Sequence, residues 1–116
     1  MPAFIEVNVS GEATKFGCAP ERARALAELV DGARGLRLAG FMTIAPFADD
    51  PEAGRPHFRA LRALRDDVAR ALSRPASELR LSMGMSHDFE VAIEEGADLV
   101  RIGTALFGPR ATVDDK

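Results

Sequence analysis

The sequence predicts an α/β fold, half of a (β/α)8 TIM-type barrel, in which four parallel strands alternate with three crossover helices. Apolar segments with the period of strands alternate along the chain with segments that have the period of helices. The spacing lets each helix serve as a right-handed crossover between parallel strands. A complete barrel of this kind needs about 250 residues. The chain has 116, so it is expected to form a single domain, over residues 1–116, that supplies half a barrel.

The first strand is expected over residues 4–10. Apolar residues such as Ile5 and Val7 alternate there with polar ones, which is typical of a strand with one polar face. Glu6 and Asn8 lie on the polar face. They either form hydrogen bonds inside the barrel or keep an exposed edge strand soluble, and the pattern does not decide between these alternatives.

The first helix is expected from Pro20 to about Val30. Proline suits the first helical position, because its fixed φ is already helical and its missing N–H is not needed there. Gly32 and Gly35 are expected to end this helix. The apolar positions that form one stripe are Ala23, Leu26, Ala27 and Val30.

The middle of the chain predicts a buried strand followed by a longer helix. Residues 36–44 are almost continuously apolar, as expected of a parallel strand covered on both faces. Gly40 within this strand indicates close backbone packing. Apolar residues with helical spacing then predict a helix from about Pro56 to Leu72, and Pro75 is expected to prevent its continuation.

The C-terminal third predicts a strand–helix–strand unit. Strands are expected over residues 78–83 and 99–103, with a helix from about His87 to Glu95 between them. Ser86 is the expected N-cap, because its hydroxyl can accept an N–H group of the first turn. Gly96 is expected to end the helix in the left-handed conformation. The polar residues 111–116 are expected to be a frayed tail.

Two polar loops of this unit are candidates for an anion site. Residues 82–86 run into a helix N-terminus, and residues 103–104 follow the next strand; in parallel barrels, the loops after the last two strands often bind phosphate. The same residues are also common in simple connections. Arg101 would point toward the ligand end of the barrel, or outward to pair with Asp98 or with a carboxylate on a helix.

Composition excludes several other classes of protein. A net charge of −3 and a pI near 5.4 provide no basic surface for nucleic acid. No apolar run approaches the roughly 20 residues that span a bilayer, so a cytoplasmic protein without a membrane partner is expected. Cys18 is the only cysteine, and His57 and His87 have no third ligand at a recognisable spacing. No metal site is therefore expected.

Three segments carry a resemblance to a known family. They are LSMGMSHDFEVAIEEGADLVRIGTALFG at residues 81–108, VNVSGEATKFG at residues 7–17 and LAGFMTIAP at residues 38–46. The chain from residue 4 to residue 110 resembles the C-terminal half of the pyridoxal phosphate homeostasis proteins, stand-alone relatives of the N-terminal barrel domain of alanine racemase.

This resemblance implies a site for pyridoxal 5'-phosphate (PLP). Ser82, Gly103 and Thr104 would bind the phosphate, while Arg101 would face the pyridine nitrogen. A cation there disfavours protonation of the ring nitrogen, which suits a cofactor carrier or a racemase better than demanding carbanion chemistry. No catalytic residue is expected. The full set of implied cofactor-binding residues is Ser82, Met83, Gly84, Met85, Ser86, Arg101, Ile102, Gly103 and Thr104.

The resemblance also implies a non-enzymatic role in intracellular PLP homeostasis, in which the cofactor is stored or delivered. The family's Schiff-base lysine lies in the N-terminal half, and the two lysines here, Lys15 and Lys116, do not correspond to it. Alternatives are a fragment of a racemase-like enzyme and a truncated gene product without independent function. The absence of tyrosine, the second acid/base of alanine racemases, weakens the enzyme alternative. The expected partners are PLP and either a second copy of the chain or a separate N-terminal half-barrel.

Overall fold

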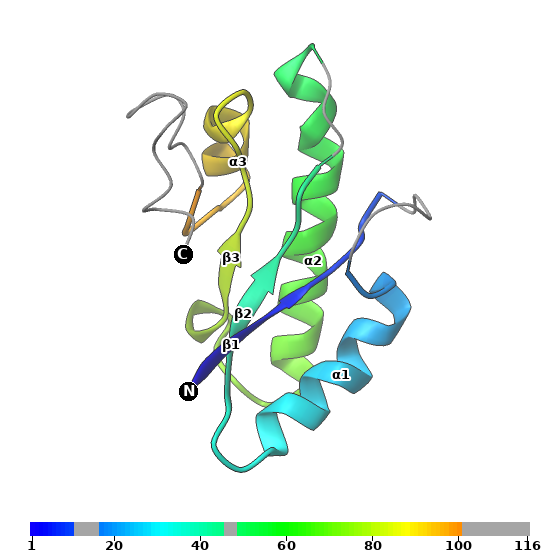
Figure 1. Cartoon of the computed structure of the whole chain (residues 1–116), viewed down its shortest axis with the longest axis vertical. Coiled ribbons are helices and arrows are strands. Elements are labelled where there is room, and N and C mark those ends of the chain that lie inside the picture. The colour runs from blue at the N-terminus through cyan, green and yellow to red at the C-terminus, as the bar shows by residue number, and fades with distance from the viewer. Residues whose placement is uncertain (11–16, 46–48, 101–116) are drawn as a thin grey trace.

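The computed structural model describes residues 1–10, 17–45 and 49–100. It consists of one parallel sheet with strand order β1-β2-β3, and the two longer helices cover one of its faces (Figure 1). Because the strands are parallel, their carboxyl ends and the loops that follow them lie at one edge. Two short 3-10 helices, η1 and η2, flank the longest helix. The elements are β1 (Pro2–Glu6), α1 (Pro20–Gly32), β2 (Arg37–Met42), η1 (Pro51–Gly54), α2 (Arg55–Ala71), η2 (Ala76–Glu78), β3 (Arg80–Ser82) and α3 (Phe89–Glu94).

The predicted α/β class with a parallel sheet is confirmed, but the predicted four strands are not. The described residues form three strands and three α-helices. Of the expected strand over residues 99–103, Leu99 forms an isolated parallel bridge with Ser82, while residues 101–103 lie outside the described part. Within the described residues, pairing of the chain beside β3 is therefore limited to the single bridge at Leu99.

The boundaries of the two longer helices follow the sequence signals closely. α1 begins at Pro20, and α2 lies within one residue of the predicted limits. The first strand begins at Pro2, two residues earlier than predicted, and ends at Glu6, four residues earlier, because Asn8 donates its N–H to the Cys18 carbonyl at 2.8 Å. The third strand was also predicted too long, because Glu78 belongs to η2. Local side-chain alternation does not reveal where a neighbouring strand stops pairing.

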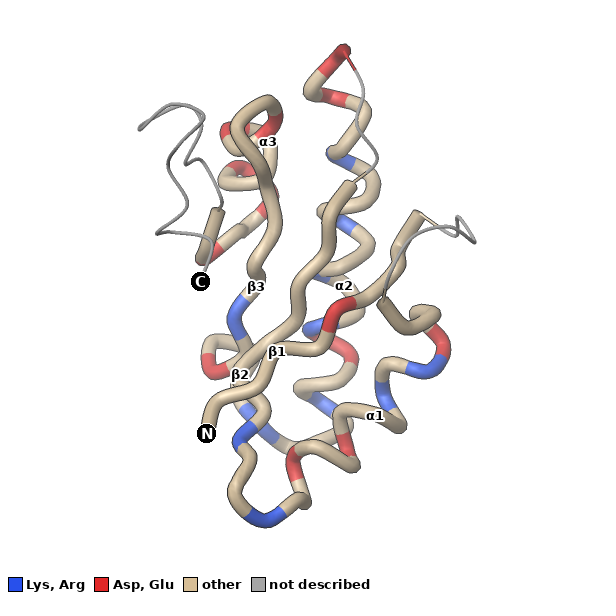
Figure 2. The backbone as a smooth tube through the Cα atoms, viewed as in Figure 1, with Lys and Arg blue, Asp and Glu red and all other residues tan. Residues whose placement is uncertain are grey.

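The core lies between the sheet and the helices. Phe41 of β2, together with Phe58 and Leu61 of α2, is fully buried there. The predicted close packing at Gly40 is confirmed, since a Cβ built at this residue would lie 2.0 Å from the carbonyl oxygen of Arg80. Figure 2 shows that charged residues fall mostly on the helices and turns. This distribution leaves the space between sheet and helices to apolar side chains.

The prediction that Leu26 lies on the buried stripe of α1 is wrong. Ala23 and Ala27 are buried, but Leu26 is 38% exposed and Leu29 is 70% exposed. These leucines line an open hollow of about 410 Å³ together with Cys18 and other residues of α1. Helical spacing placed Leu26 next to the stripe, but no described element packs against that side of α1.

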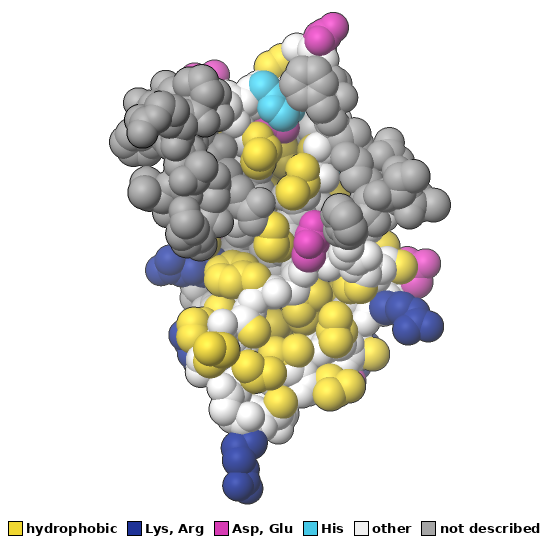
Figure 3. Space-filling view, in the orientation of Figure 1, with side chains coloured by type: hydrophobic (Ala, Val, Ile, Leu, Met, Phe, Trp, Pro, Cys, Tyr) yellow, Lys and Arg dark blue, Asp and Glu magenta, His cyan; other side chains and the backbone are white. Residues whose placement is uncertain are grey.

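The face of the sheet opposite the helices carries exposed apolar side chains (Figure 3). Phe4 is 37% exposed and Ile44 is 39% exposed, whereas their neighbours Ile5 and Ala45 are each only 5% exposed. Alternation along a strand directs successive side chains to opposite faces. Phe4 of β1 therefore points away from the helices, onto the face that would line the interior of a barrel, and Ile44 is exposed two residues beyond the end of β2.

Candidate functional site at the carboxyl edge of the sheet

The loop formed by residues 82–86 leaves β3 at the carboxyl edge of the sheet. The Ser82 carbonyl accepts the N–H of Thr43 at 3.1 Å, and the Met83 N–H donates to the Leu99 carbonyl at 3.0 Å. The Met83 side chain is 2% exposed, so it belongs to the core and not to a ligand surface. The first two residues of the loop are thus fixed by the sheet, as a rigid binding loop requires.

Gly84 makes a turn in which a side chain would be strained and would force neighbouring atoms to shift. Its φ is +106°, which side chains rarely adopt, and a Cβ there would lie 2.7 Å from the Ala92 Cβ and 3.2 Å from the Val100 Cγ1. The loop backbone therefore packs directly on α3 and on the segment after it. Within the described residues, the Gly84 and Ser86 N–H groups and the Ser82 hydroxyl donate to no protein acceptor. These donors are available to an anion.

The prediction that Ser86 is the N-cap of the following helix is wrong. α3 begins at Phe89, two residues later than expected, and its N-cap residue is Asp88. Asp88 Oδ1 accepts the Met85 N–H at 2.7 Å, and the Asp88 N–H donates to the Met85 carbonyl at 3.2 Å. The Asp88 side chain makes no capping hydrogen bond to α3, because this tight turn directs it back onto the loop at Met85.

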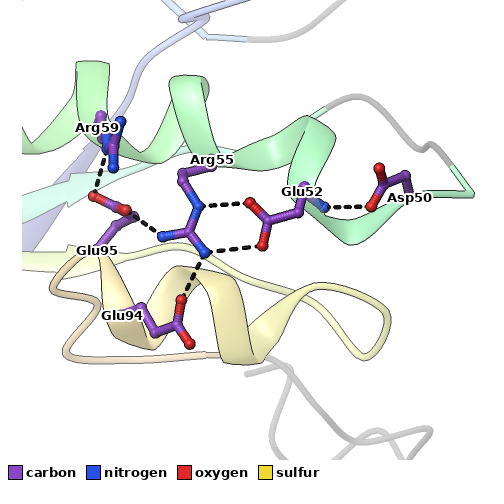
Figure 4. Close-up of polar contacts among 6 residues, drawn as sticks. All are labelled: Asp50, Glu52, Arg55, Arg59, Glu94 and Glu95. Carbon is purple, nitrogen blue, oxygen red and sulfur yellow. Dashed lines mark hydrogen bonds and ion pairs between the residues drawn. The ribbon is translucent and has the colours of Figure 1, made fainter.

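An ion-pair cluster connects α3 to the start of α2 (Figure 4). The Arg55 guanidinium donates to both carboxylate oxygens of Glu52 at 2.7 and 2.9 Å, to Glu94 at 2.6 Å and to Glu95 at 2.5 Å. Arg59 donates to the other oxygen of Glu95 at 3.1 Å. The hydrogen bond from Arg55 lowers the pKa of Glu95, and it also lowers the pKa of Glu52. The sequence had not singled out this cluster, because its members are 40 residues apart and helix charges are usually solvated.

The remaining predicted site residues, Arg101, Ile102, Gly103 and Thr104, lie outside the described residues, as does Lys15. The outward pairing of Arg101 with Asp98 is likewise not described. Within the described residues, Asp98 accepts the Leu81 N–H through Oδ2 at 2.9 Å, which ties the segment before Leu99 to β3.

Other chemical features of the described residues lie away from this loop. No group of three or more His, Cys, Asp or Glu in the described part is arranged to hold a metal ion. Burial raises the pKa of the Cys18 thiol, which makes it less reactive than an exposed thiol. An open hollow of about 870 Å³ lies between α1 and α2, with Leu64 and Val68 in its lining and Glu21 and Arg70 among its charged residues. No described helix is long and apolar enough to cross a membrane.

Comparisons with known proteins relate the whole chain to one family. The model of the alanine racemase N-terminal domain matches residues 1–111. Curated proteins named pyridoxal phosphate homeostasis protein are similar in sequence: that of Aquifex aeolicus is 54% identical over 92% of this chain, that of Pseudomonas aeruginosa 51% over 91%, and that of Homo sapiens 38% over 95%. The matched regions make up 46%, 44% and 41% of those proteins, so the chain spans just under half the length of these relatives.

Solved structures agree with the sequence relatives. A protein of Bifidobacterium adolescentis matches with a TM-score of 0.82 and 39% identity, covering 91% of this chain and 42% of that one. PipY of Synechococcus elongatus PCC7942, solved with PLP bound, matches with a TM-score of 0.74 and 28% identity, covering 92% of this chain and 49% of PipY. Together with the parallel α/β architecture and the match over residues 1–111, these similarities show that the chain belongs to the alanine racemase N-terminal domain family.

Proposed function

We propose that the chain binds PLP through the phosphate of the cofactor and takes part in PLP homeostasis. The observation that carries the proposal is the loop of residues 82–86, which presents unused donors at the carboxyl edge of a parallel sheet. Ligands of open α/β sheets bind at this edge. The similarity to PipY with PLP bound and to the named homeostasis proteins supports PLP as the ligand.

In this proposal, the Ser82 hydroxyl and the N–H groups of Gly84 and Ser86 donate to the phosphate. Gly103 and Thr104 complete the phosphate site, and Arg101 faces the ring nitrogen, with Ile102 between them in sequence. When bound, PLP supplies a reactive aldehyde for storage or delivery. The chain itself binds and orients the phosphate, and no residue is assigned a catalytic role. The names of the relatives, which designate homeostasis proteins and no enzyme, support this non-enzymatic role.

The proposal extends to partners and location. The open face of the sheet, with Phe4 and Ile44, is proposed to be covered by a second copy of the chain or by the other half of a barrel, which would carry the Schiff-base lysine. A cytoplasmic location, where apoenzymes that need the cofactor are made, belongs to the same proposal.

Ligand-dependent thermal stability tests the proposed site. PLP or inorganic phosphate with a dissociation constant of ~1 mM, present at ten times that concentration, would stabilise the folded chain by about 1.4 kcal/mol. We expect Ser82→Ala to reduce this stabilisation and the matched control Ser77→Ala, on exposed η2, to leave it unchanged. Pyridoxal without phosphate should stabilise the chain much less than PLP. A folded chain that neither PLP nor phosphate stabilises would contradict the proposed function.

A further inference from the structure

Asp88 is joined by hydrogen bonds to Met85 in the loop of residues 82–86. Its side chain is almost fully buried, and the residue is 4% exposed. Oδ1 accepts the Met85 N–H, while the backbone N–H of Asp88 donates to the Met85 carbonyl, so two hydrogen bonds join the same pair of residues. A doubly bonded turn of this kind fixes the direction of the backbone between Gly84 and Ser86.

The other carboxylate oxygen of Asp88, Oδ2, lies against the backbone at Gly54, directly before α2. A Cβ at Gly54 would lie 3.3 Å from Asp88 Oδ2 and 3.0 Å from the Phe58 ring, so the backbone between η1 and α2 packs directly on Asp88. The His87 Nε2 lies 3.4 Å from the same oxygen. Asp88 is therefore held on both sides before any ligand binds.

The ion-pair cluster joins the start of α2, which follows Gly54, to the end of α3, which begins directly after Asp88. Arg55, one residue after Gly54, bonds to Glu94 and Glu95 at the end of α3. The Arg55 side chain is 22% exposed and that of Glu95 is 10% exposed, so this contact is partly shielded from water. Charge-assisted hydrogen bonds in such surroundings are stronger and more specific in geometry than solvated ones.

We propose that Asp88 is a positioning residue that holds the loop of residues 82–86 in its anion-binding conformation. This inference rests on the proposed function, because it assigns the loop to phosphate. Asp88 acts through Met85 and does not touch the anion. A carboxylate behind an anion site is electrostatically unfavourable, so its contribution is the placement of an acceptor and not its charge. An asparagine retains that acceptor and removes the repulsion.

The test compares Asp88→Ala and Asp88→Asn with the wild-type chain. Inorganic phosphate is titrated while the amide signals of Gly84 and Ser86 are followed by NMR, and hydrogen exchange of the Met85 amide is measured without ligand. Asp88→Ala should weaken phosphate binding about tenfold, the effect of one hydrogen bond to a charged group, and should speed exchange at Met85. Asp88→Asn should bind phosphate within about twofold of wild type, or more tightly. Val68→Ala, a core change remote from the loop, controls for general loss of stability.

Each alternative outcome is distinguishable. Wild-type phosphate affinity in folded Asp88→Ala contradicts the inference while leaving the proposed function intact. Equal weakening in Asp88→Ala and Val68→Ala assigns the effect to stability and overturns the positioning role, as does an Asp88→Asn variant as weak as Asp88→Ala. A folded wild-type chain that binds no phosphate contradicts the proposed function, and this inference with it.

Discussion

The effect of a substitution at a single residue depends on the atoms that surround it, as two glycines of this chain illustrate. Gly40 lies in β2 where β3 approaches most closely, and a Cβ would overlap backbone atoms of Arg80. Gly32 ends α1 with no atom within 4 Å of the position that a Cβ would take. An alanine substitution therefore measures the effect of interior packing at Gly40 and the effect of helix propensity at Gly32.

We expect Gly40→Ala to lower the free energy of unfolding by about 3 kcal/mol, because the strands must separate to admit the methyl group. Gly32→Ala should raise it by about 0.5 kcal/mol, because alanine restricts the unfolded chain. Urea denaturation of both variants at neutral pH measures the difference. Equal stabilities of the two variants would show that β2 and β3 are not packed as described.

Glu95 illustrates an electrostatic effect at a single residue. Its pKa is lowered by the hydrogen bond from Arg55, so the carboxylate stabilises the fold above the unfolded-state pKa of about 4.3. This contribution is lost as the pH falls through the lower pKa of the folded state. Glu95→Gln should therefore be less stable than wild type at pH 7, and the difference should narrow below about pH 4.

Urea unfolding of Glu95→Gln and wild type from pH 7 to pH 3 measures this dependence. The matched control is Glu28→Gln, which removes a solvated ion pair with Arg24 on the exposed face of α1. It should change stability little at any pH. If the difference in unfolding free energy between Glu95→Gln and wild type did not depend on pH, the charge of the Glu95 carboxylate would not contribute to stability.

At the scale of elements, the loop between β3 and α3 depends on a backbone conformation that the sequence marks with glycine. Gly84 and Gly35 both have positive φ, at +106° and +86°. A Cβ at Gly84 meets Ala92 and Val100, whereas one at Gly35 meets no atom within 4 Å. Only the first glycine combines a strained conformation with a tight contact.

Alanine substitutions should separate these two contributions. Gly35→Ala is expected to lower the free energy of unfolding by about 1 kcal/mol through backbone strain alone and to leave phosphate binding unchanged. Gly84→Ala should cost about 3 kcal/mol and should also weaken phosphate binding, because the loop must move away from α3. Denaturation and phosphate titration of both variants measure this, and unchanged phosphate affinity in folded Gly84→Ala would remove Gly84 from the proposed site.

At the scale of the whole molecule, the sheet has helices on one face and exposed apolar side chains on the other. A contiguous apolar surface of this kind favours association with another chain. We expect the chain to associate in a concentration-dependent manner, because association would remove the exposed apolar side chains of the sheet from water.

The substitution Ile44→Lys should reduce that association, and sedimentation equilibrium measures both effects. Ile93→Lys, at a 53% exposed position on α3, adds the same charge away from the sheet face and should leave association unchanged. A wild-type chain that remains monomeric at all concentrations tested would contradict a second copy of the chain as the partner on this face.

Local signals in the sequence were sufficient for the start of α1, the limits of α2, the left-handed Gly96 and the α/β class. Pro20 sets the start of α1, and Gly96 takes a positive φ as predicted, because each of these effects depends on one residue and its immediate neighbours. The loop of residues 82–86 could also be located from the sequence, since polar residues followed an apolar strand. Its chemical assignment came from resemblance to a family and not from spacing.

Tertiary structure alone decided which groups meet. Asp88 and not Ser86 stands at the N-cap position, because α3 begins at Phe89, and the Asp88 side chain accepts the Met85 N–H of the preceding loop. Arg55 reaches Glu94 and Glu95 only because α2 and α3 pack side by side after an interval of about 40 residues. Leu26 is exposed because no described element covers that side of α1. Periodicity specifies which side of an element is apolar, but the partner of each side chain depends on contacts between residues that are distant in sequence.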